Sequence, residues 1–413
     1  MTTAATRIGH ELTGSHDGTR EPEPGAAPAR TRIASIDIVR GVVMLLMAID
    51  HVRVFSGQPA GGPTPGIFFT RWVTHFVAPA FVFLAGTSAF LHGERLGSRS
   101  QLSQYLLTRG AWLVVLELTV MRFAWTFNFD YAHYMLAGVI WMIGWCMILM
   151  AVLVHLPLRA LTAFALVMIL GHNVLDGVSR EAAAGTGLGW LWTILYFGGG
   201  VHLGANGPPL IVLFSIVPWI GVMAAGYAFA RVLELPVDQR RRLCLRLGVS
   251  LILAFVVLRV LDVYGDPRHW RAAPAAFPAA LAFLATNKYP ASLLFLLMTL
   301  GPTIALLPAA ERARGKVGEV LGAFGRVPFF YYVLHIPLIH VLACVVSLIR
   351  DGRVSPWLFT NHPMMNPPAP PGYMWGLPLV YAVTVLAVLL LYVPCRWFAA
   401  VKARSRSAWL SYL

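Results

Sequence analysis

An arginine and a histidine with complementary chemistry, Arg40 and His51, stand in one largely apolar run, residues 35–53. They are eleven positions apart, so on an α-helix their side chains share one stripe and lie ~16 Å apart along the axis. Imidazole titrates near neutral pH and suits a general base, whereas the forked, permanently charged guanidinium suits phosphate. The stripe therefore predicts a binding site along the first helix, with a base at one end and a phosphate-binding cation at the other.

Two carboxylates, Asp37 and Asp50, interrupt the same run. A charge inside an apolar span costs ~2.5–3.5 kcal/mol on insertion scales and persists mainly where it faces a helix-bundle interior or a water-filled cavity. Asp37 and Arg40 are also spaced as an i,i+3 pair, which would neutralise itself at the membrane interface, and His51 would then lie among headgroups. The functional site and this structural interpretation both fit the run.

Further polar groups interrupt later apolar segments. His75 comes early in the second segment, so that His75 and His51 fall near the same side of the bundle and can meet across a helical hairpin. Glu117 and Arg122 share the third segment, where they form either a buried ion pair or part of a site. His172 and Asp176 have i,i+4 spacing, which suits a carboxylate-oriented base or a pair at a helix end. The remaining candidates are Lys288, Tyr289, Arg326 and His335.

Composition excludes a soluble globule. The 413 residues are 58% hydrophobic and only 12% charged, with a mean hydropathy of +0.68, which indicates a polytopic membrane protein. No ten-residue alternation suggests a barrel, so we expect an all-α fold. About ten segments approach the ~20 residues that a spanning helix needs. They are residues 35–55, 72–93, 105–126, 134–155, 158–177, 208–233, 243–263, 289–308, 327–349 and 376–399.

Arginine and lysine gather in alternate loops, which predicts that both termini face the cytoplasm. This asymmetry accounts for the formal net charge of +14 without nucleic acid as a partner. Residues 1–32 lack an apolar signal core and are expected to form a disordered cytoplasmic tail ahead of a transmembrane domain over 33–413. The four cysteines lack metal-type spacing, so neither a metal site nor a disulfide framework is indicated. Trp190 and Trp192, in a loop predicted on the non-cytoplasmic side, suit an interfacial helix better than substrate contact.

The motifs together resemble a known family. Asp37-x-x-Arg40-Gly41, Pro79-x-Phe81-x-Phe83-x-x-Gly86, Lys288-Tyr289-Pro290-x-Ser292 and the segment from Gly325-Arg326 to His335 are similar to the bacterial branch related to heparan-alpha-glucosaminide N-acetyltransferase. The Arg40-x10-His51 spacing resembles the hallmark of the wider transmembrane acyltransferase superfamily. This resemblance implies transfer of an acetyl or other acyl group from cytoplasmic acyl-CoA to a hydroxyl or amine on the far side, such as that of a sugar or an envelope glycan.

The resemblance assigns His51 as general base or transient acyl carrier, with Asp50, His75 and Glu117 as supporting catalytic groups. It makes Arg40, Asp37, Lys288, Tyr289, Arg326 and His335 candidates for holding acetyl-CoA, with no metal. A multi-pass protein of the bacterial inner membrane is expected, and a homodimer is left open. A transporter or permease is the main alternative, although the internal repeats typical of transporters are not evident. A non-catalytic membrane scaffold is a second alternative.

Overall fold

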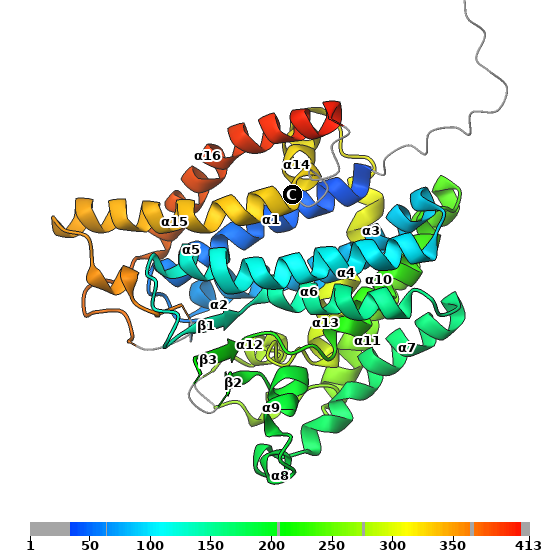
Figure 1. Cartoon of the computed structure of the whole chain (residues 1–413), viewed down its shortest axis with the longest axis horizontal. Coiled ribbons are helices and arrows are strands. Elements are labelled where there is room, and N and C mark those ends of the chain that lie inside the picture. Colours follow the sequence, from blue (N-terminus) through cyan, green and yellow to red (C-terminus); the bar gives the residue numbers. More distant parts are fainter. Residues whose placement is uncertain (1–33, 63, 205–206, 275–276, 364–366, 406–413) are drawn as a thin grey trace, which may run out of the picture. The chain divides into compact units, whose positions relative to one another are not determined.

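The computed structural model describes residues 34–62, 64–204, 207–274, 277–363 and 367–405, which belong to one compact unit. The tail predicted for residues 1–32 lies outside the described residues. The longer helices are α1 (Ala34–Phe55), α3 (Val77–Leu96), α4 (Arg99–Leu116), α6 (Val139–Leu153), α7 (Leu158–Gly171), α10 (Trp219–Leu233), α11 (Val237–Leu261), α13 (Leu293–Ala310), α14 (Gly315–Arg326), α15 (Pro328–Asp351) and α16 (Leu377–Arg404). Figure 1 shows their arrangement.

Short helices and single turns join these elements. The short helices are α2 (Pro65–Trp72), α5 (Arg122–Thr126), α8 (Arg180–Gly185), α9 (Gly189–Trp192) and α12 (Ala279–Leu284). The 3₁₀ and π turns are η1 (Val73–Phe76), η2 (Glu117–Met121), η3 (His172–Gly177), η4 (Thr193–Phe197), η5 (Trp270–Ala272) and η6 (Pro356–Phe359). The hydroxyl of Ser292 caps α13 by accepting a hydrogen bond from the Phe295 amide, which fixes where that helix begins.

Helix α1 is surrounded by other helices. It packs against α3, α13, α14, α15 and α16, so the segment that carries Arg40 and His51 lies inside the bundle. Two glycines allow its closest approach to α14, because side-chain carbons at Gly41 and Gly325 would collide with backbone atoms of Leu321 and Asp37 respectively. Small residues at such crossings permit close packing of helices in membranes.

Among the described residues, six helical segments are long and apolar enough to cross a membrane. They are Pro65–Leu96, Leu158–Gly177, Val237–Leu261, Leu293–Ala310, Pro328–Asp351 and Leu377–Arg404. Two shorter apolar helices, α6 and α10, accompany them. The fold is thus the predicted helical membrane type, while the count of ten spans and the orientation of the termini stay predictions.

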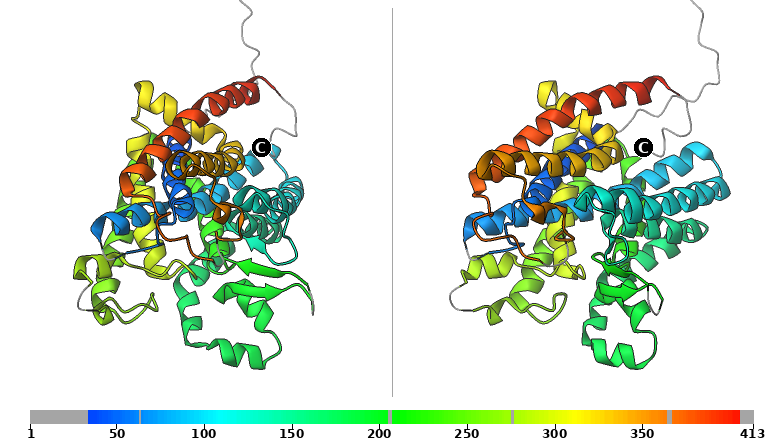
Figure 2. Two further views of the ribbon diagram at one scale, coloured as in Figure 1. Left: turned by 90° about the vertical axis from the view of Figure 1, so that its left-hand side faces the viewer. Right: turned by 60° about the vertical axis from the view of Figure 1, so that its left-hand side comes forward.

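A small sheet departs from the all-α expectation. Its strands are β1 (Met135–Ala137), β2 (Gly199–His202) and β3 (Pro209–Val212), in the order β1-β3-β2. β1 and β3 pair in parallel, with Met135 opposite Leu210, whereas β2 and β3 are antiparallel. The segment predicted as a span over 208–233 therefore begins as a strand and becomes helical only at Trp219. In Figures 1 and 2, β2 and β3 lie together with α8 and α9 at one end of the helices.

Candidate active site

His51 of α1 and His335 of α15 form a hydrogen-bonded pair. The Nδ1 atom of His51 lies 2.6 Å from Nε2 of His335, and the two rings stack with their centroids 4.8 Å apart. Trp125 stands edge-on to His51, with 4.9 Å between ring centroids. His335 is completely buried. The structure thus places this histidine, assigned from the sequence to donor binding, beside the assigned base.

The hydrogen-bond pattern assigns a tautomer to both rings. Nδ1 of His335 lies 2.6 Å from the carbonyl oxygen of Tyr332, which can only accept, so this nitrogen carries the proton. Nε2 of the neutral His335 ring is then an acceptor, and His51 must donate to it from Nδ1. The lone pair of His51 lies on Nε2, which receives no hydrogen bond from the described residues. The Tyr332 carbonyl and His335 therefore fix the tautomer of His51 and leave its Nε2 able to accept a proton.

A second group of side chains adjoins His51. Asp50 accepts hydrogen bonds on Oδ1 from Nε and Nη2 of Arg53, each at 3.1 Å, and on Oδ2 from Nη1 of Arg71 at 2.5 Å. The other terminal nitrogen of Arg71 donates to the Tyr289 hydroxyl at 3.4 Å. Lys288 completes the group, with its ammonium 5.2 Å from the Tyr289 ring centroid. We call these five residues the Asp50 cluster.

The Asp50 cluster carries excess positive charge. Arg53, Arg71 and Lys288 are all buried and stand against a single carboxylate. No carboxylate of the described residues lies within 4.0 Å of the Lys288 ammonium. Burial, followed by the positive charge of Arg71, lowers the pKa of Lys288 below its usual value. Such a cluster favours negative charge that develops or binds beside His51.

Asp266 holds the loop that carries Lys288 and Tyr289 through hydrogen bonds. One oxygen of this carboxylate accepts from the Asn287 amide at 2.8 Å and from the Ser292 hydroxyl at 2.7 Å. Burial raises the pKa of Asp266, and these hydrogen bonds oppose the rise. His172 faces the Ala291 carbonyl at 2.9 Å from the other side. The loop is therefore held at both ends.

His172 and Asp176 do not form the predicted pair. Both ring nitrogens of His172 face backbone carbonyls, and Asp176 accepts from the Asn173 amide at 2.7 Å and from the Tyr196 hydroxyl at 2.5 Å. The helix becomes a 3₁₀ turn at His172, which changes the angular offset between the two positions. Both residues therefore help to pack the loop, and Asp176 does not orient His172 as a base.

His75 lies close to the Asp50 cluster without joining it. Its ring packs edge-on against Phe295, with 5.5 Å between centroids, and its buried Nδ1 has no hydrogen-bond partner in the described residues. No hydrogen bond or ring contact between the described side chains joins His75 to His51, so the predicted meeting of the two histidines is not seen.

The predicted ion pair between Glu117 and Arg122 is wrong. Arg122 is buried and donates instead to backbone carbonyls of Tyr134, Asn128 and Asp130. A guanidinium with five N–H groups satisfies several of these carbonyls at once. Glu117 turns the other way, with its carboxylate against Gly138, where α6 begins.

The Glu117 carboxylate is buried and under-satisfied. It faces the Gly138 and Ile140 amides and the Tyr332 hydroxyl, but neither oxygen completes a hydrogen bond of normal geometry. The same Tyr332 supplies the carbonyl that orients His335. Glu117 thus lies behind the histidine pair and does not contact His51 directly.

The remaining candidates gather at the other end of α1. Arg40 donates to the Leu84 carbonyl at 3.0 Å and to the Ser88 hydroxyl, both on α3, and lies 3.9 Å from Asp37. Arg326 is exposed at the end of α14, next to the glycine that packs on Asp37. Hence α1 separates a histidine site from an arginine site.

Sequence reasoning missed Arg53, Arg71 and Trp125 as site residues. Arg53 and Arg71 flank His51 and His75 in the sequence, so an excess of basic residues next to both histidines was the available signal. Trp125 had no such signal, because its contact with His51 depends on tertiary packing. Within the described ranges, no group of three or more His, Cys, Asp or Glu side chains is placed to hold a metal ion.

A known protein family matches this chain. The family model described as heparan-alpha-glucosaminide N-acetyltransferase, catalytic, matches residues 32–264, more than half of the chain. The matched region contains His51 and most of the Asp50 cluster, while Lys288, Tyr289 and His335 lie beyond it. No curated protein matches the chain. The match says nothing of oligomeric state, so the homodimer that the sequence left open gains no support.

Proposed function

The chain belongs to the heparan-alpha-glucosaminide N-acetyltransferase family, and from this membership and the geometry around His51 we propose that it is an acyl-CoA-dependent membrane acyltransferase. Acetyl-CoA is the donor that the family uses in general. The acceptor we propose is a hydroxyl or amine of a sugar or envelope glycan. We further propose that the protein lies in a bacterial inner membrane, with the donor reaching it from the cytoplasm.

One observation supports this proposal most. His51 donates through Nδ1 to His335, which leaves the Nε2 lone pair for a substrate proton. In the proposed reaction, Nε2 takes the proton of the acceptor as its oxygen or nitrogen bonds to the thioester carbonyl carbon. The carbon–sulfur bond then breaks, and His51 returns the proton to the CoA thiolate. The His335 acceptor stabilises the transient imidazolium of His51.

The Asp50 cluster supplies the electrostatic part of the mechanism. As the acceptor attacks, negative charge develops on the thioester oxygen. Buried cations already fixed by hydrogen bonds stabilise such charge without reorganising. We assign this role to Lys288 and Arg71, with Asp50 holding Arg71 in position.

The donor would lie along α1. The ~16 Å between Arg40 and His51 is of the same order as the pantetheine arm of CoA. Arg40 and Arg326, at the opposite end of the helix from His51, would then meet the nucleotide phosphates. The basic residues of the Asp50 cluster lie at the His51 end of α1, too far from Arg40 to bind the same phosphates.

The test is acyl transfer from labelled acetyl-CoA to a glucosamine acceptor in proteoliposomes. His51→Ala should lower kcat/KM by about 10²–10⁴, the usual contribution of a general base. His133→Ala is the matched control, because His133 is an exposed loop histidine paired only with Asp130. Wild-type turnover by His51→Ala would remove the histidine from the mechanism, and substrate flux without any acyl-CoA requirement would identify a transporter instead.

A further inference from the structure

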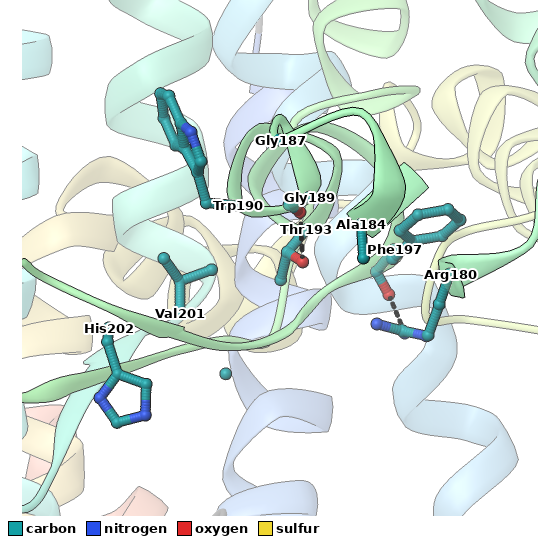
Figure 3. Close-up of a pocket in the computed structure, with 10 residues that line it drawn as sticks. Arg180, Ala184, Gly187, Gly189, Trp190, Thr193, Phe197, Val201 and His202 are labelled. Carbon is teal, nitrogen blue, oxygen red and sulfur yellow. Dashed lines mark hydrogen bonds between the residues drawn. The ribbon is translucent and has the colours of Figure 1, made fainter. Parts of the chain in front are cut away.

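A cavity of about 500 Å³ lies in the part of the chain built from α8, α9, η4 and β2. It shares no residue with the histidine pair or the Asp50 cluster. Figure 3 shows its walls, with Trp190 on one side, Arg180 on the other and His202 on the strand. The full lining is Arg180, Ala184, Gly187, Gly189, Trp190, Thr193, Phe197, Gly200, Val201 and His202. Its size falls in the range of small-ligand sites.

Two hydrogen bonds and a ring contact hold Arg180 on the polar wall of the cavity. Arg180 donates from Nη1 to the Gly198 carbonyl at 3.0 Å and from Nη2 to the Phe197 carbonyl at 3.1 Å. Its guanidinium also lies 5.0 Å from the Phe197 ring centroid. These contacts use two of five N–H groups, so a fixed cation with further donors borders the cavity. A Cβ atom at Gly187, where φ is +72°, would have no other atom within 4 Å, so the cavity is open beside this glycine.

The apolar wall is an exposed indole. Trp190 is 55% exposed, so a large part of its ring is open to an occupant of the cavity. An indole offers a flat apolar face and one N–H donor, so it suits a ligand with both apolar and hydroxylated surfaces. An anchor in hydrocarbon would also explain the exposure, but Arg180 and His202 are exposed in the same cavity, and burying them in lipid would be costly.

We propose that this cavity binds a pyranose unit of a glycan. The C–H face of the sugar would lie on Trp190, and its hydroxyls would meet Arg180, His202 and the glycine backbone. This inference goes beyond the proposed transfer reaction, because it concerns binding and requires no catalysis. It would give a polymeric acceptor a second point of attachment. Strand β2, which lines the cavity, pairs with β3, and β3 pairs with β1. The chain continues from β1 into Gly138, which lies against Glu117, so the sheet connects the cavity to the surroundings of the candidate active site.

The test is direct binding by the full chain in nanodiscs, followed by calorimetry and saturation-transfer NMR. The probes are soluble tetrasaccharides of N-acetylglucosamine, of glucose and of a glucuronic-acid-containing glycan. We expect at least one to bind, with affinity about tenfold weaker or more for Trp190→Ala. Trp112→Ala is the matched control, because Trp112 is 42% exposed on α4, away from the cavity, and should bind as the wild type does.

Three results would overturn the proposal. The first is failure of the wild type to bind any of the three tetrasaccharides, and the second is equal binding by Trp190→Ala and the wild type. The third comes from nanodiscs made with brominated lipid: loss of a strongly quenched fluorescence component in Trp190→Ala would place the indole in the acyl region. None of these depends on acyl transfer, so His51→Ala should bind the sugar normally whether or not the transfer reaction is confirmed.

Discussion

Replacing His335 tests whether the histidine pair is a catalytic unit. His335→Leu removes the acceptor of the His51 Nδ1 proton while keeping a buried side chain of comparable size. His335→Gln offers an amide oxygen that can accept the same hydrogen bond. If His335 serves only to fill the core, the two variants should behave alike.

The expected size of the effect follows from one hydrogen bond. Neutral His51 already donates to His335, and a neutral hydrogen bond contributes about 0.5–1.5 kcal/mol, against about 1.5–3 kcal/mol for one to a charged group. The bond therefore strengthens by roughly 1–1.5 kcal/mol when His51 takes the acceptor proton. At about 1.4 kcal/mol per factor of ten, its loss should lower kcat by roughly 5–12-fold. KM should change little, because neither His335 nitrogen faces a substrate.

The assay compares kcat and KM for acetyl transfer by the wild type, His335→Leu and His335→Gln in proteoliposomes. His335→Gln should recover much of the turnover that His335→Leu loses. Melting temperatures in the same detergent separate catalytic loss from unfolding. The reasoning is refuted if His335→Leu retains more than half of the wild-type kcat, or if the two variants lose activity equally at equal stability.

Three further changes test the surroundings of the pair. Lys288→Met should lower kcat by about 10²–10³, as removal of an oxyanion donor does. Because the pKa of Lys288 is lowered, its charge and with it the activity should be lost as the pH rises through that pKa. Lys288→Arg should extend the activity to higher pH, because a guanidinium stays charged. An unchanged loss of activity at alkaline pH in Lys288→Arg would contradict this role. Asp50→Asn leaves two buried arginines without their carboxylate and should cost roughly 3–5 kcal/mol, read as a clearly lower melting temperature; an unchanged melting temperature would show that the pairing contributes nothing. Gly138→Ala places a methyl group against the Glu117 carboxylate and should lower the free energy of unfolding by about 1–3 kcal/mol. The double variant with Glu117→Ala should recover this stability. Gly171→Ala serves as the control, because its methyl group would enter open space.

The positions of most helices could be predicted from the sequence, because a membrane demands ~20 apolar residues in every spanning helix. The strands could not, since β1, β2 and β3 have only three or four residues each, too few for a period-two pattern. Their pairing is also non-local: Leu210 stands opposite Met135. The single predicted span over 208–233 therefore merged a strand with a helix.

The sequence singles out several residues of the candidate site, but it does not predict how they are arranged. His51 and Arg40 could be singled out because α-helix geometry relates positions within one segment. His335 could not be assigned to His51, because 284 residues separate them and no local period links α1 with α15. The Glu117 and Arg122 pairing failed for the same reason, since each side chain found partners on a different neighbouring element.

The arrangement of helices explains how α1 keeps its charges. In the outer spans Leu158–Gly177 and Val237–Leu261 only 22% of the residues in the most apolar window are buried, so hydrophobic side chains on these helices are left to face lipid. Helix α1 is enclosed by five others, and each of its acidic side chains is paired with arginine. A helix shielded in this way can hold a base and cations at fixed positions, because the surrounding helices carry the contact with lipid. At most positions of α7 or α11 the same charges would face hydrocarbon, so the proposed catalytic site is better placed on the central helix.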